Sequence, residues 1–105
     1  GKYENGQNPD DARLTLFGDM FTRYTKPKGR KVALKLNILA LDNDLTPTQM
    51  ALSYVNSRPF ITSNIIGATK MDQLKENIES VEIELNEEII EEIENIHIQD
   101  PYPCP

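Results

Sequence analysis

The sequence predicts an α/β chain that is largely α-helical when considered alone and contains one buried strand. Four segments carry apolar residues at helical spacing, and residues 60–66 form one short run rich in β-branched residues. The strand is followed by Gly67 and a further helix. A buried strand without neighbours would leave N–H and C=O groups unpaired, at about 1–3 kcal/mol each. We therefore expect its partner strands to lie outside these 105 residues.

Length and composition indicate one domain or a piece of one. The chain is 38% hydrophobic and 27% charged, as is usual for a folded soluble protein. Its net charge of -6 disfavours nucleic acid and anionic membrane surfaces as partners. It has no transmembrane-length apolar run, no leader-like start and one cysteine, Cys104, so we expect a cytoplasmic protein. Because residue 1 is Gly rather than Met, we also expect residues upstream.

Residues 1–28 are polar and interrupted by glycine and proline, which predicts a loop with at most a short helical turn near Leu14–Phe21. Residues 29–57 predict two helices. The first runs from Gly29 to about Asn43 and has two apolar strips, which suggests burial on more than one side. The second helix is predicted from Thr46 and Gln49, which can form a capping box, and from Pro47, which suits the first helical turn. We expect it to end before Pro59.

Two more helices follow the predicted strand. The first spans residues 70–80, with Thr69 as its cap and an apolar stripe formed by Met71, Leu74 and Ile78. The last spans residues 86–97, with Asn86 as its cap.

The passage from strand through Gly67 into a helix suggests an anion site. Free N–H groups of a helix's first turn attract phosphate, and Gly67 permits close backbone approach. Thr69 would add a hydroxyl and Lys70 a positive charge. Gln73, Glu76 and Asn77 share one helix face that could bond an adenine or ribose. By spacing alone, the alternative is that Gly67 only turns the chain and these polar residues are solvated.

The order of several motifs identifies a resemblance to the aldo-keto reductases, in the bacterial branch similar to the voltage-gated potassium channel β-subunits. The stretch from Gly67 to Asn77 resembles that family's C-terminal cofactor motif. The motifs preceding it are Gly1-Lys2-Tyr3 with Gly6, Ala12-Arg13, Thr15-Leu16-Phe17, and Thr46-Pro47 to Tyr54. The resemblance implies the C-terminal portion of a (β/α)8 TIM barrel, with Gly1 just after strand 7, residues 60–66 as strand 8 and residues 86–96 as an outer helix.

The resemblance also implies an NADP site. Residues 1–28 would be the cofactor and active-site loop, with Lys2 and Arg13 on the pyrophosphate. The 2′-phosphate and adenine would meet Gly67, Ala68, Thr69, Gln73, Glu76 and Asn77. Many family members have arginine where Gln73 stands, and glutamine cannot make the charged bidentate contact. Preference for NADP over NAD is therefore left open, with Lys70 as a substitute charge.

The implied reaction is hydride transfer to a small aldehyde or ketone, with a tyrosine as general acid assisted by lysine, aspartate and histidine. Those positions belong to earlier barrel strands and none maps onto this chain, so we expect no catalytic residue here. His97 closes a helix, where the dipole alone explains it. The chain would need the rest of the barrel as its partner and would be inactive alone.

A second hypothesis is a non-catalytic helical interaction module, a homo-oligomer that pairs residues 60–66 across a two-fold axis. Two charge clusters have simple interpretations. The glutamates between residues 79 and 94 predict a solvated face without a metal site, and the basic residues between 23 and 35 predict a solvated loop and helix start.

Overall fold

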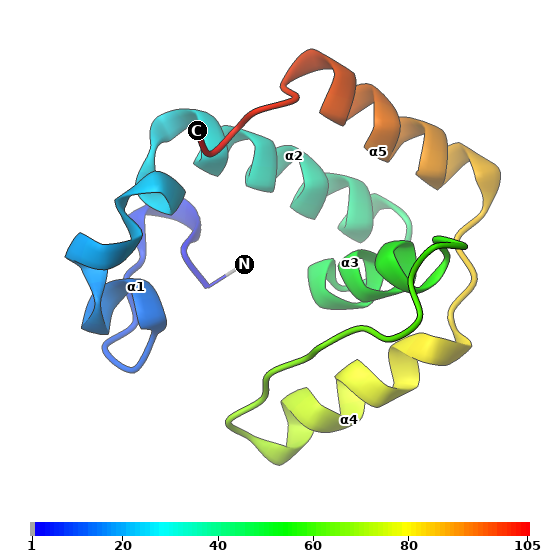
Figure 1. Ribbon diagram of the computed structural model, residues 1–105, viewed down its shortest axis with the longest axis horizontal. Coiled ribbons are helices and arrows are strands. Elements are labelled where there is room, and N and C mark those ends of the chain that lie inside the picture. The colour runs from blue at the N-terminus through cyan, green and yellow to red at the C-terminus, as the bar shows by residue number, and fades with distance from the viewer. Residues whose placement is uncertain (1) are drawn as a thin grey trace.

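The computed structural model describes residues 2–105, apart from the side chain of Asn5, so the predicted position of Gly1 after strand 7 lies outside it. The chain curves around an open centre (Figure 1). Helices α2 and α5 run side by side, α3 packs against α2, and α4 packs against α3. The elements in order are η1 (Glu4–Gly6), α1 (Arg13–Leu16), η2 (Gly18–Thr25), α2 (Pro27–Asp42), α3 (Pro47–Asn56), α4 (Met71–Glu79), η3 (Ser80–Glu82) and α5 (Glu87–Gln99).

The first 26 residues contain more helical turns than the predicted loop. Helix α1 and the first half of η2 overlap the turn expected near Leu14–Phe21, but η1 and the rest of η2 are additional. Both are 3-10 helices, whose short-range hydrogen bonds need little apolar periodicity. Helix α2 begins at Pro27, before the predicted Gly29, because proline suits the first helical position.

Two predicted helix caps are confirmed. The Thr46 hydroxyl accepts the Gln49 N–H at 3.1 Å, and Gln49 Oε1 accepts the Thr46 N–H at 2.9 Å, which completes the capping box of α3. Asn86 Oδ1 accepts the Ile89 N–H at 2.9 Å and caps α5. Each cap satisfies donors that the helix leaves without intrahelical partners.

The core lies where α2, α3 and α5 meet. Ala40, Met50 and Ile89 are buried there, each from one of the three helices. Five partly buried residues surround them: Leu36, Leu39, Leu45, Leu85 and Ile93. The first apolar strip of α2 therefore faces this core, as predicted, whereas Leu34, Ile38 and Leu41 of its second strip remain exposed.

Residues 60–66 are not a strand in this structure, and no strand occurs anywhere within residues 2–105. Phe60 is 78% exposed and Ile65 is 95% exposed. A strand is defined by hydrogen bonds to a neighbour, and within residues 2–105 no other segment pairs with residues 60–66 in this way. Strand 8 in an assembled barrel therefore stays a prediction.

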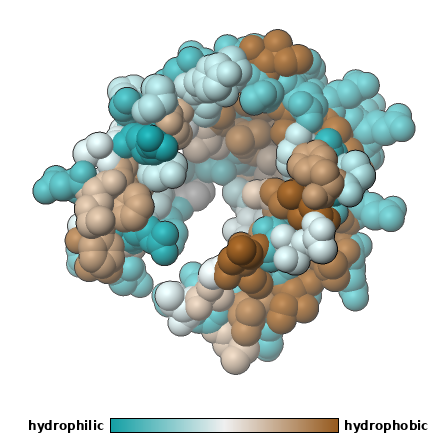
Figure 2. Space-filling view, in the orientation of Figure 1, coloured by the Kyte–Doolittle hydropathy of each residue, from teal (hydrophilic) through white to brown (hydrophobic). Residues whose placement is uncertain are grey.

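Helix α4 differs from expectation in two respects. Its N-cap is Lys70 and not Thr69, and no side chain caps it. Its apolar stripe of Met71, Leu74 and Ile78 is exposed and not buried. Figure 2 shows apolar residues along this side of the molecule, over α4 and the loop before it. The apolar pattern is present, but the surface that it would cover is absent from this chain.

Candidate cofactor site at the start of α4

The start of α4 offers unused backbone donors. The first-turn N–H groups of a helix have no intrahelical acceptors, and Lys70 at the N-cap supplies no side-chain acceptor for them. The segment leading into α4 is irregular and exposed from Ile65 to Lys70. A Cβ placed on Gly67 would meet nothing within 4 Å, so the backbone at Gly67 is open to approach. This is the geometry that a phosphate group can use.

The Gln73 side chain bonds to Thr69, just before the first residue of α4. Its Oε1 accepts the Thr69 backbone N–H at 3.1 Å and the Thr69 hydroxyl at 3.3 Å. One backbone donor of the predicted site is therefore already engaged within the chain. The Lys70 side chain is exposed and has no ion pair among the described residues, so its charge remains available.

Glu76 and Asn77 lie one turn further along α4 and are both partly buried. The Thr46 hydroxyl donates a hydrogen bond to the Glu76 carboxylate, which ties α4 to the N-cap of α3. Asn77, together with Gly67 and Ile66, lines a shallow groove of about 440 Å³ between α3 and the loop before α4. The structure thus brings Gly67 and Asn77 to one groove, while Glu76 faces the start of α3.

The two basic residues predicted to contact pyrophosphate lie elsewhere. The Lys2 ammonium lies 5.9 Å from the Tyr3 ring centroid, and the Arg13 guanidinium lies 5.8 Å from that of Phe21. Arg13 lines a separate cavity of about 650 Å³ beside α2. This chain alone therefore does not gather Lys2 and Arg13 with the residues at the start of α4.

The N-terminal segment is nevertheless anchored to α2. The Asn37 side-chain amide donates to the Glu4 carboxylate, and this hydrogen bond lowers the pKa of Glu4. The Tyr3 hydroxyl accepts the Leu14 N–H at 3.1 Å. These contacts fix the path of the residues on either side of Lys2 and Arg13.

Comparison with known proteins decides the family. Residues 1–98 match the model of the Aldo/keto reductase family, and this range includes every residue of the candidate site. The chain belongs to the aldo/keto reductase family.

Relatives of this aldo/keto reductase chain are longer proteins. Protein tas of Escherichia coli K12 is 47% identical over all 105 residues, which cover 30% of its length. The putative voltage-gated potassium channel subunit beta of Schizosaccharomyces pombe is 31% identical over 91% of the chain and 29% of that protein. The L-glyceraldehyde 3-phosphate reductase of Escherichia coli K12 is 37% identical over 77% of the chain and 24% of that protein. The chain therefore spans less than a third of the length of each.

Part of the basic segment between residues 23 and 35 of this aldo/keto reductase chain, predicted to be a solvated loop and helix start, forms contacts within the chain. Three of those residues hold the C-terminal segment against α2: Lys28 and Lys35 pair with Asp100, and Lys26 Nζ donates to the Pro105 carbonyl oxygen at 3.0 Å. The sequence separation is too large for local spacing to reveal these pairs. The sequence indicates these pairs only in that Asp100 carries a charge opposite to that of the lysines.

Neither a metal cluster nor a membrane-spanning helix is found in the part of the chain that the structure describes. Within residues 2–105, no three His, Cys, Asp or Glu side chains are grouped to hold a metal ion. None of the helices in the same range combines the length and apolar character needed to traverse a bilayer.

Proposed function

We propose that this chain is the cofactor-holding C-terminal portion of an NADP-dependent aldo-keto reductase that reduces aldehydes or ketones. The observation that carries the proposal is the start of α4, where uncapped backbone donors follow the open Gly67 inside the family-matched region. The catalytic residues would lie in the rest of the barrel, with which this chain would assemble. The small carbonyl substrate would likewise be bound mainly by those other parts.

The residues at the start of α4 fit the adenosine end of the cofactor. Backbone N–H groups from Gly67 to Thr69 and the Lys70 ammonium would bind the 2′-phosphate, because helix starts and positive charge both stabilise phosphate. Asn77, which shares the groove with Gly67, would bond the adenine. Glu76 would hold α4 in register through Thr46 and bond the adenine with its remaining acceptor capacity. When bound, the nicotinamide supplies the hydride.

Lys2 and Arg13 are proposed to reach the pyrophosphate once the missing strands bring the two ends of the chain together. Both side chains are exposed and rest against aromatic rings, and neither is committed to an ion pair among residues 2–105. A charge held only by an exposed ring contact of about 0.5–1 kcal/mol can be redirected to a phosphate.

A chimera tests the proposal. This chain would replace the matching stretch of Protein tas, and NADPH binding would be followed by quenching of protein fluorescence. We expect saturable binding that Gly67→Val weakens by at least about tenfold, since a branched side chain blocks backbone approach. Asn95→Val, at an exposed position of α5 outside the proposed site, serves as the control. Equal affinity of the Gly67→Val and parent chimeras would refute the site.

Turnover provides a second measurement. The 105-residue chain alone should not oxidise NADPH in the presence of a small aldehyde, whereas the chimera should. Turnover by the isolated chain would contradict the placement of the catalytic groups outside it. The alternative function, a non-catalytic module that pairs through residues 60–66, is favoured only by the exposure of Phe60 and Ile65, and under it the chimera would bind no NADPH.

A further inference from the structure

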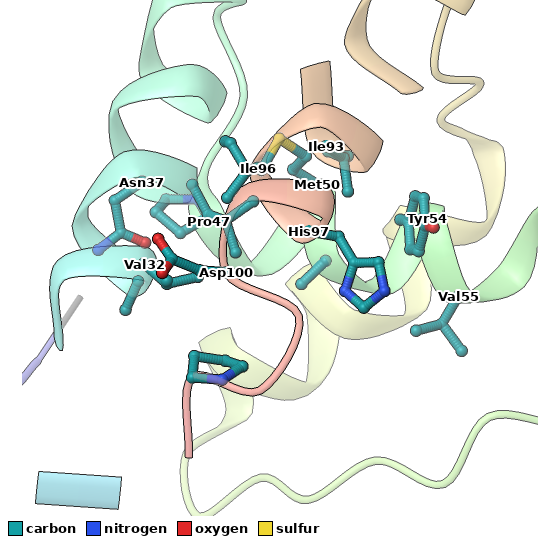
Figure 3. Close-up of a pocket in the computed structure, with 14 residues that line it drawn as sticks. Val32, Asn37, Pro47, Met50, Tyr54, Val55, Ile93, Ile96, His97 and Asp100 are labelled. Carbon is teal, nitrogen blue, oxygen red and sulfur yellow. The ribbon is translucent and has the colours of Figure 1, made fainter. Parts of the chain in front are cut away.

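A further cavity lies between α2, α3 and α5, and it shares Pro47 and Ala51 with the groove beside Gly67. Its volume is about 480 Å³, within the range of small-molecule sites. Of 14 lining residues, only Asn37, His97 and Asp100 have strongly polar side chains. Figure 3 shows Ile93, Ile96 and Met50 grouped on one side, with His97 and Asp100 nearer the C-terminal segment. The walls are therefore apolar and the polar groups few.

The carboxylate that lines this cavity is already paired within the chain. The Asp100 carboxylate pairs with the Lys28 ammonium at 3.4 Å and with the Lys35 ammonium at 3.7 Å. Asn37 is engaged by Glu4. A cationic ligand would find no unpaired carboxylate here, and neither lysine is among the lining residues, which leaves His97 as the polar group available to a guest. The cavity therefore suits an uncharged, mainly apolar molecule with one hydrogen-bonding group.

The C-terminal strap, residues 100–105, forms one side of the cavity through Asp100 and Pro103. It crosses α2 where Gly29 leaves room: a Cβ there would approach Cys104 Sγ to 2.8 Å. Strap prolines at 101, 103 and 105 prevent the helix from continuing. The strap is thus seated on α2 as an extended segment and not as a continuation of α5.

The attachments of the strap are weak ones. Lys28 and Lys35 have side chains 49% and 33% exposed, and ion pairs with this exposure are screened by salt. The Lys35 ammonium also binds Gln99 Oε1 at 3.0 Å, at the C-terminal end of α5, where positive charge is favoured. A strap held by a few such contacts can open while the three-helix core stays intact.

We propose that this cavity binds a small uncharged apolar molecule and that the strap, latched by Lys28 and Lys35 on Asp100, controls entry to it. The inference is independent of the cofactor site at the start of α4. It rests on the apolar walls, on the pairing of the rim charges and on the position of Pro103 and Asp100 at the cavity edge.

Binding is tested with the neutral probe N-phenyl-1-naphthylamine on the 105-residue chain. We expect saturable fluorescence at one probe per chain, and at least about tenfold weaker binding in Val55→Phe, which fills the cavity at a residue that does not line the groove beside Gly67. Asn95→Phe places a phenyl group at an exposed α5 position outside the lining. Loss of binding only in Val55→Phe, with far-UV circular dichroism unchanged, supports the site. Equal binding by Val55→Phe and the parent, or no saturable binding, overturns it.

The latch is tested through Cys104, the one cysteine of the chain. Its labelling by uncharged 4,4′-dithiodipyridine reports opening of the strap at constant pH. Asp100→Asn should speed labelling roughly two- to twenty-fivefold, since it removes two ion pairs that each hold the strap by a factor of about 1.4 to 5. Glu91→Gln, with the same charge change away from the strap, should label at the parent rate. If Asp100→Asn also labels at the parent rate, the latch is refuted.

Discussion

Gln73 Oε1 accepts the backbone N–H of Thr69 at 3.1 Å, so the side chain expected to meet a phosphate instead occupies a donor of the proposed phosphate site. A bound 2′-phosphate would compete with this internal hydrogen bond. The competition gives a physical reason why a glutamine at this position should hold NADP less tightly than an arginine. Arginine would leave the Thr69 donor free and add a bidentate charged contact.

Gln73→Arg in the chimera with Protein tas should therefore strengthen NADPH binding about tenfold and leave NADH binding nearly unchanged. The expected gain is that of a charge-assisted hydrogen bond, about 1.5–3 kcal/mol before the cost of ordering the side chain. Fluorescence titration with both dinucleotides measures the ratio. Asn95→Arg, an equal charge on α5, is the control. A parallel rise for NADH would show general electrostatic attraction and not recognition of the 2′-phosphate.

Thr46→Val should lower the free energy of unfolding by roughly 1–2 kcal/mol. The change removes the hydroxyl that caps α3 and that also binds Glu76. Denaturant unfolding followed by circular dichroism gives the value. Thr48→Val, two residues along the same helix and exposed, makes the same chemical change without these contacts and should shift stability by less than about 0.5 kcal/mol. Equal losses in the two variants would contradict the role of the cap.

Local signals predicted the helices well because their causes are local. The capping residues Thr46 and Asn86 satisfy donors within three residues, so sequence spacing alone locates them. Buried Met50 and Ile89 follow from the apolar period of α3 and α5. Non-local contacts were not predictable. The Lys28 and Asp100 pair joins residues 72 positions apart, and no periodic pattern encodes which lysine meets which carboxylate.

The candidate site was predicted in part. Spacing placed Gly67 before a helix start and put Asn77 on that helix, and the structure brings both to one groove. The cap at Thr69 was wrong, because Gln73 bonds the Thr69 backbone from within the helix and the helix begins after Lys70. The predicted strand at residues 60–66 depends on neighbouring strands. Its apolar, β-branched residues are typical of a buried strand, but residues 2–105 supply no strand to pair with it.

Tyr54 should ionise at a higher pH than an ordinary tyrosine side chain. The hydrogen bond that its hydroxyl donates to the Glu94 carboxylate raises its pKa above the usual value of 10.0, because the ionised phenolate would face that carboxylate. A raised folded-state pKa means that this contribution to stability is present below about pH 10 and is lost as pH rises through the folded-state pKa.

The measurement is the difference in ultraviolet absorbance titration between the parent and Tyr54→Phe, which isolates this phenol from Tyr3, Tyr24 and Tyr102. Glu94→Gln should return the midpoint of Tyr54 toward 10.0. Glu92→Gln, at an exposed position of the same helix, should leave the Tyr54 midpoint in place. If the pKa of Tyr54 in the parent is not raised, the hydrogen bond between Tyr54 of α3 and Glu94 of α5 is contradicted.

The 105-residue chain made by itself should self-associate through the segment that lacks its partners. Phe60, Ile65, Met71 and Ile78 are 78%, 95%, 66% and 60% exposed, and unpaired backbone beside them offers hydrogen bonds to a second chain. Sedimentation velocity should show dimers or larger species that Ile65→Lys reduces. Ile98→Lys, at a residue 73% exposed on α5, should not reduce them. A compact monomer in the parent would mean that residues 60–66 need no external strand, and the barrel interpretation of that segment would fail.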